Sequence, residues 1–231
     1  MKLCVFSDVH GNVVPLQRML SIERGNVDQF FFLGDIFGYF HEQSSIIDTL
    51  MNLENIHSIK GNHEKNYLLS LHENSYKKLM VEKYGVSYEL MISERQLAYI
   101  QRLPECSEFI LDGLKIGFFH GGPDDFLEQR VYPDTVLSEE SCGKYDYIFL
   151  GHTHYRLNKQ VGRTCVVNPG SLGQPRDGKG FSYCIFDTQK RKFEFKQIEL
   201  DMEIVLNGVK AKEHESNNYL YLLKKYGRSG V

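Results

Sequence analysis

The first sixty residues alternate between short apolar runs and longer amphipathic segments, and this alternation constrains the fold more than any other feature. The runs KLCVFS, QFFFL and IHSIK have the length and apolar character of buried strands. Between them, VVPLQRMLSIER and EQSSIIDTLMNL place apolar residues at helical spacing. A chain that alternates strand and helix in this way favours right-handed crossovers and a largely parallel sheet.

The rest of the chain follows a different pattern. Residues 65–103 are mostly helical in character, and SERQLAYIQRL begins with a capping box formed by Ser93 and Gln96. The segment EFILDGLKIGFFH predicts a hairpin around Asp112-Gly113. Two more hairpins are expected in RLNKQVGRTCVVN and FSYCIFDTQKRKFEFKQIEL, and YDYIFL is expected to be another buried strand. A helical tail is expected from about 202 to 226, with Gly227 as its stop.

Together these elements predict an α/β fold in which two mixed β-sheets pack as a sandwich flanked by helices. The 231 residues suit one large domain, and no Pro/Gly/Ser-rich linker divides them. We therefore expect a single domain over 1–231. The helical segment at about 65–103 would be a cap-like addition to it, and the segment at about 202–226 a C-terminal helical tail.

Charge and composition exclude several classes of function. The net charge of -3 and the pI near 6.3 imply no broad basic field, so the chain has no strong nucleic-acid signature. No apolar run approaches the ~20 residues that span a membrane. Asp8 and His10 come too early for a signal peptide. The 5 cysteines form no CxxC pair, which favours buried free thiols in a reducing compartment. We expect a cytoplasmic protein without a membrane partner.

Five short polar segments, DVH, GD, GNHE, HGG and GHTH, follow predicted strands or open the next loop. Such loops form the usual ligand crevice of α/β sheets. If the backbone is extended, side chains at i and i+2 point the same way, so Asp8 can act with His10, and His152 with His154. Each segment alone could be a turn, but five of the same kind favour one metal site. Structural or surface roles are expected for the histidines outside these segments: His41, His57, His72 and His214.

The ordered set DVHGN, GDIFGY, GNHE, HGG and GHTH resembles the calcineurin-like metallophosphoesterase superfamily. The pattern of that superfamily is D-x-H, G-D, G-N-H-[DE], a lone H and G-H-x-H, and all five blocks occur in order across residues 8–154. The segment NPGSLGQPRD, residues 168–177, resembles the small bacterial phosphodiesterase branch. The resemblance implies the αββα metallophosphoesterase fold.

The resemblance also implies two divalent metal ions and one catalytic histidine. The implied ligands are Asp8, His10 and His154 for the first ion, Asn62, His120 and His152 for the second, and Asp35 as a bridge. Mixed nitrogen and oxygen ligands suit Mn²⁺, Fe²⁺/Fe³⁺, Zn²⁺ or Ni²⁺ better than Ca²⁺. The remaining histidine of the GNHE block, His63, would lie near the leaving-group oxygen, where it could donate a proton or stabilise negative charge.

The implied reaction is hydrolysis of a phosphodiester or nucleotide-type phosphate by in-line attack of a metal-bridging hydroxide. Two divalent ions, two carboxylates and a hydroxide leave about one positive charge, which attracts a small phosphorylated substrate. The alternatives are a phosphomonoesterase, including a protein phosphatase, and a dinucleoside polyphosphate hydrolase. A more distant alternative is a non-catalytic scaffold with the same fold, although such a scaffold would not need the full set of ligand positions. The oligomeric state is not implied.

One departure from the superfamily bears on the substrate. Its Ser/Thr protein phosphatases carry G-D-x-x-D-R-G, whereas this chain has Gly38 and Tyr39 in place of the Asp and Arg. The Asp would support the catalytic histidine and the Arg would hold the phosphate, so protein phosphatase activity is less expected here.

Three residues are candidate substrate contacts, and each has a structural alternative. Tyr39 closely follows Asp35 but could simply be packed in the core. Arg176 could replace the missing phosphate-binding arginine or serve a structural purpose. Asn12 could bond the phosphate, although capping the following helix is the stronger expectation. Glu64 could orient His63 or begin the next helix, where an acid suits the helix dipole, and we expect the second role.

Overall fold

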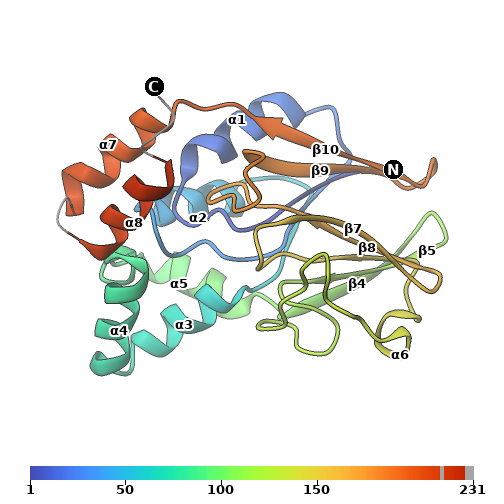
Figure 1. The fold of residues 1–231 in the computed structure, drawn as a ribbon, viewed down its shortest axis with the longest axis horizontal. Helices are drawn as coiled ribbons and strands as arrows, with labels where there is room; N and C mark the ends of the chain where they lie inside the picture. The colour runs from blue at the N-terminus through green and yellow to red at the C-terminus, as the bar shows by residue number, and fades with distance from the viewer. Residues whose placement is uncertain (214–215, 227–231) are drawn as a thin grey trace.

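The computed structural model describes residues 1–213 and 216–226, and its N-terminal third forms the parallel core expected from the strand–helix alternation (Figure 1). Three strands pair in parallel: β1 (Lys2–Phe6), β2 (Gln29–Phe32) and β3 (Ile56–Ser58). The crossovers are α1 (Val13–Glu23) and α2 (Gln43–Met51). Antiparallel strands β9 (Phe181–Asp187) and β10 (Lys192–Ile198) complete this sheet in the order β10-β9-β1-β2-β3.

The second sheet has the order β4-β5-β6-β8-β7 and contains the other two expected hairpins. The first hairpin is β4 (Cys106–Leu111) with β5 (Leu114–Phe119), and the second is β7 (Arg156–Val161) with β8 (Thr164–Pro169). Between them, β6 (Tyr147–Phe149) pairs in parallel with β5 and β8. Both sheets are therefore mixed, as predicted.

Burial on both faces explains why β1 is continuously apolar from Leu3 to Phe6. Leu3 and Val5 face the second sheet and pack in one cluster with Phe118 and Phe149. The alternate residues of the strand, such as Phe6, pack in another cluster with α1, α2 and α5. Burying one such side chain contributes about 1.5–3 kcal/mol. The two sheets thus form a sandwich with helices against the outer face of the first sheet (Figure 1).

The outer face of the second sheet is covered differently. Val131, Leu137 and Cys142 come from the segment between β5 and β6 and pack against Ile148 and Val166. Within that segment the structure has one short helix, α6 (Glu139–Cys142). An irregular segment therefore protects this face instead of long helices.

The expected helical segment forms four elements after β3. They are α3 (Asn62–Ser70), α4 (Asn74–Tyr84), the 3-10 helix η1 (Val86–Tyr88) and α5 (Glu94–Arg102). The predicted capping box at the start of α5 is present, because Ser93 accepts from the backbone of Gln96 and Gln96 accepts from the backbone of Ser93. The first of these helices, α3, begins at Asn62, three residues before the expected position of 65 and within the GNHE block.

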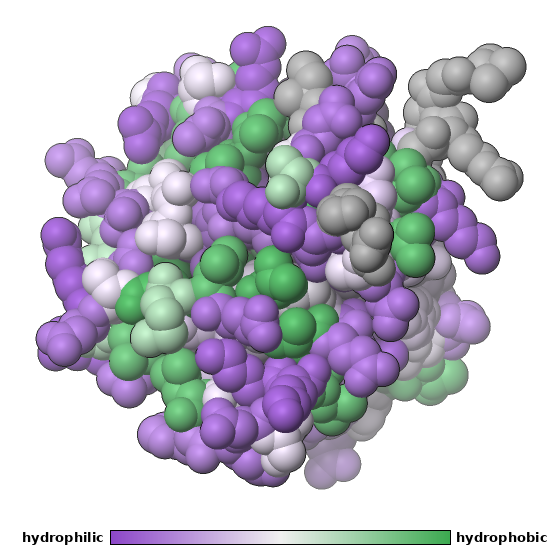
Figure 2. Space-filling model, turned by 90° about the vertical axis from the view of Figure 1, so that its left-hand side faces the viewer, coloured by the Kyte–Doolittle hydropathy of each residue, from purple (hydrophilic) through white to green (hydrophobic). Residues whose placement is uncertain are grey.

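The expected tail consists of two helices, α7 (Met202–Glu213) and α8 (Asn217–Tyr226), and the predicted stop at Gly227 lies outside the described residues. Leu206, Val209 and Leu222 of the tail pack on Tyr39 and Phe40. Figure 1 shows the tail beside α1 and α4, at the helical end of the molecule. Figure 2 looks onto that end, where hydrophobic residues form separate groups among hydrophilic ones.

Cysteine burial follows the prediction only in part. All five thiols are free, and Cys4, Cys142 and Cys184 are buried, but Cys106 and Cys165 are partly exposed. These two lie on strands β4 and β8 of the second sheet. Among the described helices, none combines the length and the apolar character that a membrane span requires.

Candidate metal centre

The five polar segments meet where strands of both sheets end. Asp8 and His10 follow β1, Asp35 follows β2, and Asn62 with His63 begins α3 after β3. His120 follows β5, and His152 with His154 follows β6. The carboxyl ends of these strands lie together, so segments more than a hundred residues apart share one buried site.

The backbone of these loops is left-handed, not extended. Of the nine non-glycine residues with positive φ in the described part of the chain, five are implied ligands: Asp8, His10, Asp35, His152 and His154, with φ between 49° and 69°. The expected extended backbone at these pairs is therefore wrong. The side chains of Asp8 and His10 still converge, whereas His152 and His154 belong to different groups. Backbone strain of this kind is concentrated at functional sites, where the surrounding structure must hold it. Here Asp8 N–H donates to Gly34 O at 3.0 Å and His10 N–H donates to Asp35 O at 2.9 Å.

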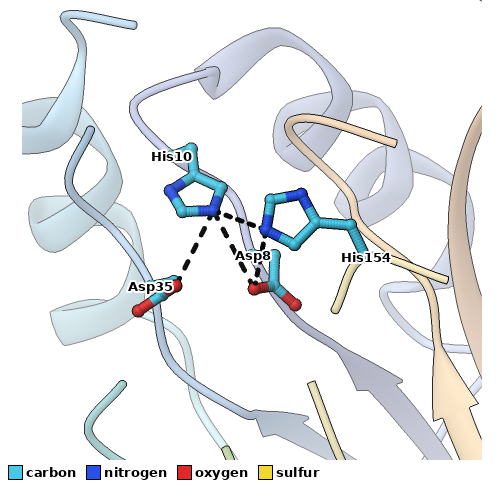
Figure 3. Close-up of side chains that lie close together, drawn as sticks. All are labelled: Asp8, His10, Asp35 and His154. Atoms are coloured by element: carbon cyan, nitrogen blue, oxygen red, sulfur yellow. Dashed lines mark hydrogen bonds and ion pairs between the residues drawn. The ribbon is translucent and has the colours of Figure 1, made fainter. Parts of the chain in front are cut away.

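The first group of side chains consists of Asp8, His10, Asp35 and His154 (Figure 3). The Nε2 atoms of His10 and His154 lie 3.0 Å apart. Asp8 Oδ1 is 3.2 Å from His154 Nε2, and Asp35 Oδ2 is 3.7 Å from His10 Nε2. All four residues are buried, so two carboxylates and two imidazoles face one small volume.

The second group consists of Asp35, His120 and His152, so Asp35 belongs to both groups. His120 Nε2 lies 3.2 Å from Asp35 Oδ2. The amide oxygen of Asn62 lies 3.0 Å from His120 Nε2 and 3.2 Å from both His152 Nδ1 and Asp35 Oδ2, so it faces lone-pair atoms. Two arrangements would satisfy these atoms. Either the Asn62 amide is rotated so that its NH₂ group donates to them, or a cation lies among them and all of them coordinate it. The donor set therefore fits a divalent ion.

Three of the histidines are oriented by their outer nitrogens. The Nδ1 atoms of His10, His120 and His154 lie 2.7, 2.8 and 2.6 Å from the carbonyl oxygens of Phe37, Leu33 and Gln174. A carbonyl only accepts, so Nδ1 carries the hydrogen and Nε2 is left with a lone pair in the neutral ring. Metal-binding histidines are commonly held in this way.

The electrostatics of the cluster also favour a cation. Burial alone would raise the pKa of Asp8 and Asp35, but His154 beside Asp8 and His120 beside Asp35 outweigh it and lower both pKa values. Burial lowers the pKa of His10 and of His152, which keeps these rings neutral. Burial would also lower the pKa of His120, yet the Asp35 carboxylate raises it to about 10. The two buried carboxylates thus attract positive charge, which a divalent ion could supply.

His63 lies beside these groups and contacts a residue that sequence patterns did not indicate. Its Nε2 is 3.9 Å from Asp35 Oδ2, and its Nδ1 is 2.8 Å from the hydroxyl of Tyr88. His63 is 5% exposed, and burial lowers the pKa of its ring to about 4. No motif marks Tyr88, because it lies 25 residues further along the chain in a helical segment of ordinary composition.

Glu64 begins α3, as expected, but it has a second role. It is fully buried and occupies the third helical position, where its carboxylate accepts the Gly61 N–H at 2.6 Å. The same carboxylate accepts the N–H groups of Asp35 and Ile36 at 2.8 and 2.6 Å. Glu64 therefore holds the loop that carries Asp35, in addition to beginning the helix.

The three candidate substrate contacts lie in different surroundings. Tyr39 packs edge-on against His10, with ring centroids 4.9 Å apart, and its hydroxyl accepts from Arg176 Nη2 at 3.0 Å. Asn12 occupies the position before α1, but its side chain makes no capping hydrogen bond and donates instead to Gly173 O at 3.2 Å. The expected helix cap is therefore wrong. Asn12 instead links the loop after β1 to the segment that contains Gly173.

The NPGSLGQPRD segment braces the ligand loops. Ser171 Oγ and Gly173 N–H both donate to the carbonyl oxygen of Asp8, at 2.8 and 2.9 Å. Asn168 Nδ2 donates to Gly151 O at 2.6 Å, directly before His152. Since Gln174 O also orients His154, the segment supports the first group of side chains from behind.

The other histidines that the structure describes lie away from the cluster. His41 Nε2 contacts Glu213 Oε1 at 2.6 Å, which attaches the tail to the loop after Tyr39. His57 stacks on Phe31 with ring centroids 5.0 Å apart, and His72 is exposed on the surface. The structural and surface roles expected for these three are confirmed, whereas His214 lies outside the described residues.

Known proteins resemble this chain over most of its length. Residues 1–191 match the calcineurin-like phosphoesterase superfamily domain. The chain is 31% identical over 223 residues to the uncharacterized protein MJ0912 of Methanocaldococcus jannaschii, covering 87% of this chain and 88% of that protein. It is 25% identical over 214 residues to phosphodiesterase MJ0936 of the same organism, covering 87% of this chain and 100% of that protein.

A solved structure shows the same fold. The metallophosphoesterase from Sphaerobacter thermophilus superposes with a TM-score of 0.78 at 24% identity, covering 97% of this chain and 98% of that one. Two mixed sheets with a buried Asp/His cluster at their strand ends define a metal-dependent phosphoesterase, a hydrolase of ester bonds. The chain belongs to the calcineurin-like phosphoesterase superfamily, so the resemblance seen in its motifs is confirmed.

Proposed function

We propose that the chain hydrolyses a phosphodiester or nucleotide-type phosphate with two divalent cations. The observation that carries this proposal is the place of Asp35, the one carboxylate common to both groups of metal-capable side chains in the described residues. One cation would be held by Asp8, His10 and His154, the other by Asn62, His120 and His152, and Asp35 would contact both. When bound, such a pair supplies a water nucleophile and neutralises charge on the phosphoryl oxygens.

The residues around the cluster would bind the substrate and stabilise the negative charge on its leaving group. His63 lies at the Asp35 side of the cluster without belonging to either group, so its imidazole remains free to face the leaving-group oxygen. Arg176, held by Tyr39 on one side and by Gln174 Oε1 at 3.0 Å on the other, is placed to bind a phosphate oxygen. Asn12 would assist only if its amide left Gly173.

The substrate preference follows from what the loop after Asp35 contains. Gly38 provides no carboxylate to support the catalytic histidine and Tyr39 no guanidinium to hold the phosphate, so both of these protein phosphatase residues are absent from this loop. The relative MJ0936 is named a phosphodiesterase, which supports a diester over a phosphoprotein. The mixed nitrogen and oxygen ligands suit Mn²⁺, Fe²⁺/Fe³⁺, Zn²⁺ or Ni²⁺. We also infer that α3 to α5 form a cap on a single domain.

The proposal is tested by metal analysis of the purified protein, followed by a phosphoester panel with that metal restored. We expect about two ions per chain and faster hydrolysis of bis-p-nitrophenyl phosphate and a dinucleotide than of p-nitrophenyl phosphate. A preference for the monoester would favour a phosphomonoesterase. A protein that binds no divalent ion and hydrolyses none of these esters would support the scaffold alternative instead.

A further inference from the structure

The catalytic role proposed for His63 requires its ring to be held in one orientation, and the contact that holds it is the hydroxyl of Tyr88. The oxygen lies 2.8 Å from His63 Nδ1, and Tyr88 is only 1% exposed. Because both partners are buried, water cannot replace this hydrogen bond without rearrangement. The imidazole therefore has one fixed polar partner on the side away from Asp35.

Gly38 occupies the place where the superfamily's protein phosphatases carry an aspartate, and it packs directly against the His63 ring. A Cβ atom at position 38 would lie 2.8 Å from His63 Nδ1 and 2.9 Å from Cε1, and Gly38 has φ +93°. A side chain here would therefore strain the backbone and displace the imidazole. Position 38 therefore has no side chain, and the hydrogen-bond partner of His63 Nδ1, Tyr88, comes from another segment of the chain.

The segment that carries Tyr88 is tied to the loop that carries Asp35 and Gly38. Gly38 N–H donates to Ser87 Oγ at 3.0 Å, and Tyr39 N–H donates to Tyr84 O at 2.7 Å. The two acceptors, Tyr84 O and Ser87 Oγ, lie four residues and one residue before Tyr88 in the chain. The helical segment is therefore part of the wall of the site and fixes where the Tyr88 hydroxyl lies.

The direction of the hydrogen bond follows from the partners available. Among the described residues, the hydroxyl of Tyr88 has His63 Nδ1 as its one hydrogen-bond partner. A buried O–H group left without an acceptor costs about 1–3 kcal/mol, so the hydroxyl should donate to Nδ1. Burial also raises the pKa of Tyr88 well above its usual value, so the hydroxyl keeps its proton. The neutral ring must then carry its own hydrogen on Nε2.

We propose that Tyr88 is the positioning residue for His63, and that its hydroxyl fixes the imidazole with hydrogen on Nε2, directed at the leaving-group oxygen. An aspartate beside Nδ1, in place of the Tyr88 hydroxyl, would instead accept a hydrogen bond from Nδ1. It would favour the opposite tautomer, with hydrogen on Nδ1. The catalytic part of this inference rests on the proposed function, whereas the hydrogen bond and the tautomer do not.

The kinetic test is Tyr88→Phe, which removes the hydroxyl and keeps the ring. The substrates are methyl p-nitrophenyl phosphate and methyl phenyl phosphate, which differ only in how stable the leaving group is. We expect kcat for the phenyl ester to fall about tenfold or more, kcat for the nitrophenyl ester to fall less than about threefold, and KM and metal content to stay unchanged. The matched control is Tyr84→Phe, because the Tyr84 ring packs 4.5 Å from the same imidazole without bonding its nitrogen.

The second readout is the tautomer itself, measured by ¹⁵N NMR of the side chain in Zn²⁺-loaded protein, with His63→Ala to assign the signal. The wild type should show hydrogen on Nε2, and Tyr88→Phe should show a mixture. Equal losses of kcat on both esters, an equal effect of Tyr84→Phe, or an unchanged tautomer would each overturn the proposal. If no ester is hydrolysed while the tautomer still shifts, the proposed function fails and the positioning role stands.

Discussion

The Glu64 carboxylate accepts the backbone N–H of Asp35 at 2.8 Å, although the two residues are 29 positions apart. The same carboxylate accepts from Ile36 and Gly61, so one buried acid joins the loop after β2 to the start of α3. These hydrogen bonds fix the positions of Asp35 and Asn62 relative to each other. The position of the proposed bridging carboxylate thus depends on a residue that touches no metal.

Replacing Glu64 with Ala should reduce both stability and metal binding. Three backbone N–H groups would lose their acceptor, and burial raises the pKa of Glu64 to about 7, so its carboxyl is only partly charged at neutral pH. Hydrogen bonds contribute about 0.5–1.5 kcal/mol each, so we expect the free energy of unfolding to fall by roughly 3 kcal/mol. Urea denaturation measures this change. The control is Glu94→Ala, an exposed acid in the first turn of α5, where a change below about 1 kcal/mol is expected. Equal effects of the two substitutions would contradict the role of Glu64.

Glu64 also shows where prediction from the sequence ends. Its spacing after Gly61 is local and predicts a helix start, but nothing local indicates that the chain returns to place Asp35 beside it. The strands, hairpins and ligand blocks were predictable because period and motif spacing are local signals. The left-handed backbone at Asp8 and His152 and the contact between Tyr88 and His63 depend on tertiary packing.

His63→Ala should abolish most turnover and leave metal binding intact. His63 contacts Asp35 only at 3.9 Å and belongs to neither metal-capable group, so we expect kcat to fall about 10²- to 10³-fold, as for loss of a hydrogen-bond donor that stabilises developing negative charge. Metal content and turnover are measured on the same preparation. The matched control is His72→Ala, which removes an exposed histidine. Loss of an ion from His63→Ala would show that this residue is a ligand.

Asp35→Asn should weaken both metal sites at once, because the Asp35 carboxylate contacts both groups of side chains. We expect a metal content well below that of the wild type and no measurable hydrolysis. Asp8→Asn is the comparison, because Asp8 belongs to the first group alone and its loss should spare the second ion. Metal analysis after dialysis distinguishes the two. If both variants lost the same single ion, Asp35 would not bridge.

Arg176→Gln should weaken substrate binding without affecting the metals. A charge-assisted hydrogen bond to phosphate would be lost, so we expect KM to rise roughly 10- to 100-fold while kcat at saturation changes little. Tyr39→Phe removes the 3.0 Å hydrogen bond that holds the guanidinium and should shift KM in the same direction by less. Steady-state kinetics on one diester separate the two parameters. A lower melting temperature with an unchanged KM would mean that Arg176 is structural.

Glu213→Gln should loosen the tail in a way that depends on pH. Burial alone would raise the pKa of Glu213, but hydrogen bonds from His41 and Asn218 outweigh it and lower the pKa below its usual 4.5. A lowered pKa in the folded state stabilises the protein above the unfolded pKa, and this contribution disappears as pH falls through the folded one. We therefore expect Glu213→Gln to cost about 2 kcal/mol at pH 7 and progressively less below about pH 4.5.

The control for that experiment is Glu42→Gln, since Glu42 joins the same tail to the same loop through an exposed contact with Lys212 at 3.2 Å. Exposed pairs contribute about 0–1 kcal/mol, so this variant should unfold nearly as the wild type does. Urea titrations of the three proteins at pH 7 and in the acid range provide the comparison. A loss in Glu213→Gln that stays constant with pH would mean that packing, and not the buried charge, attaches α7 and α8 beside Tyr39.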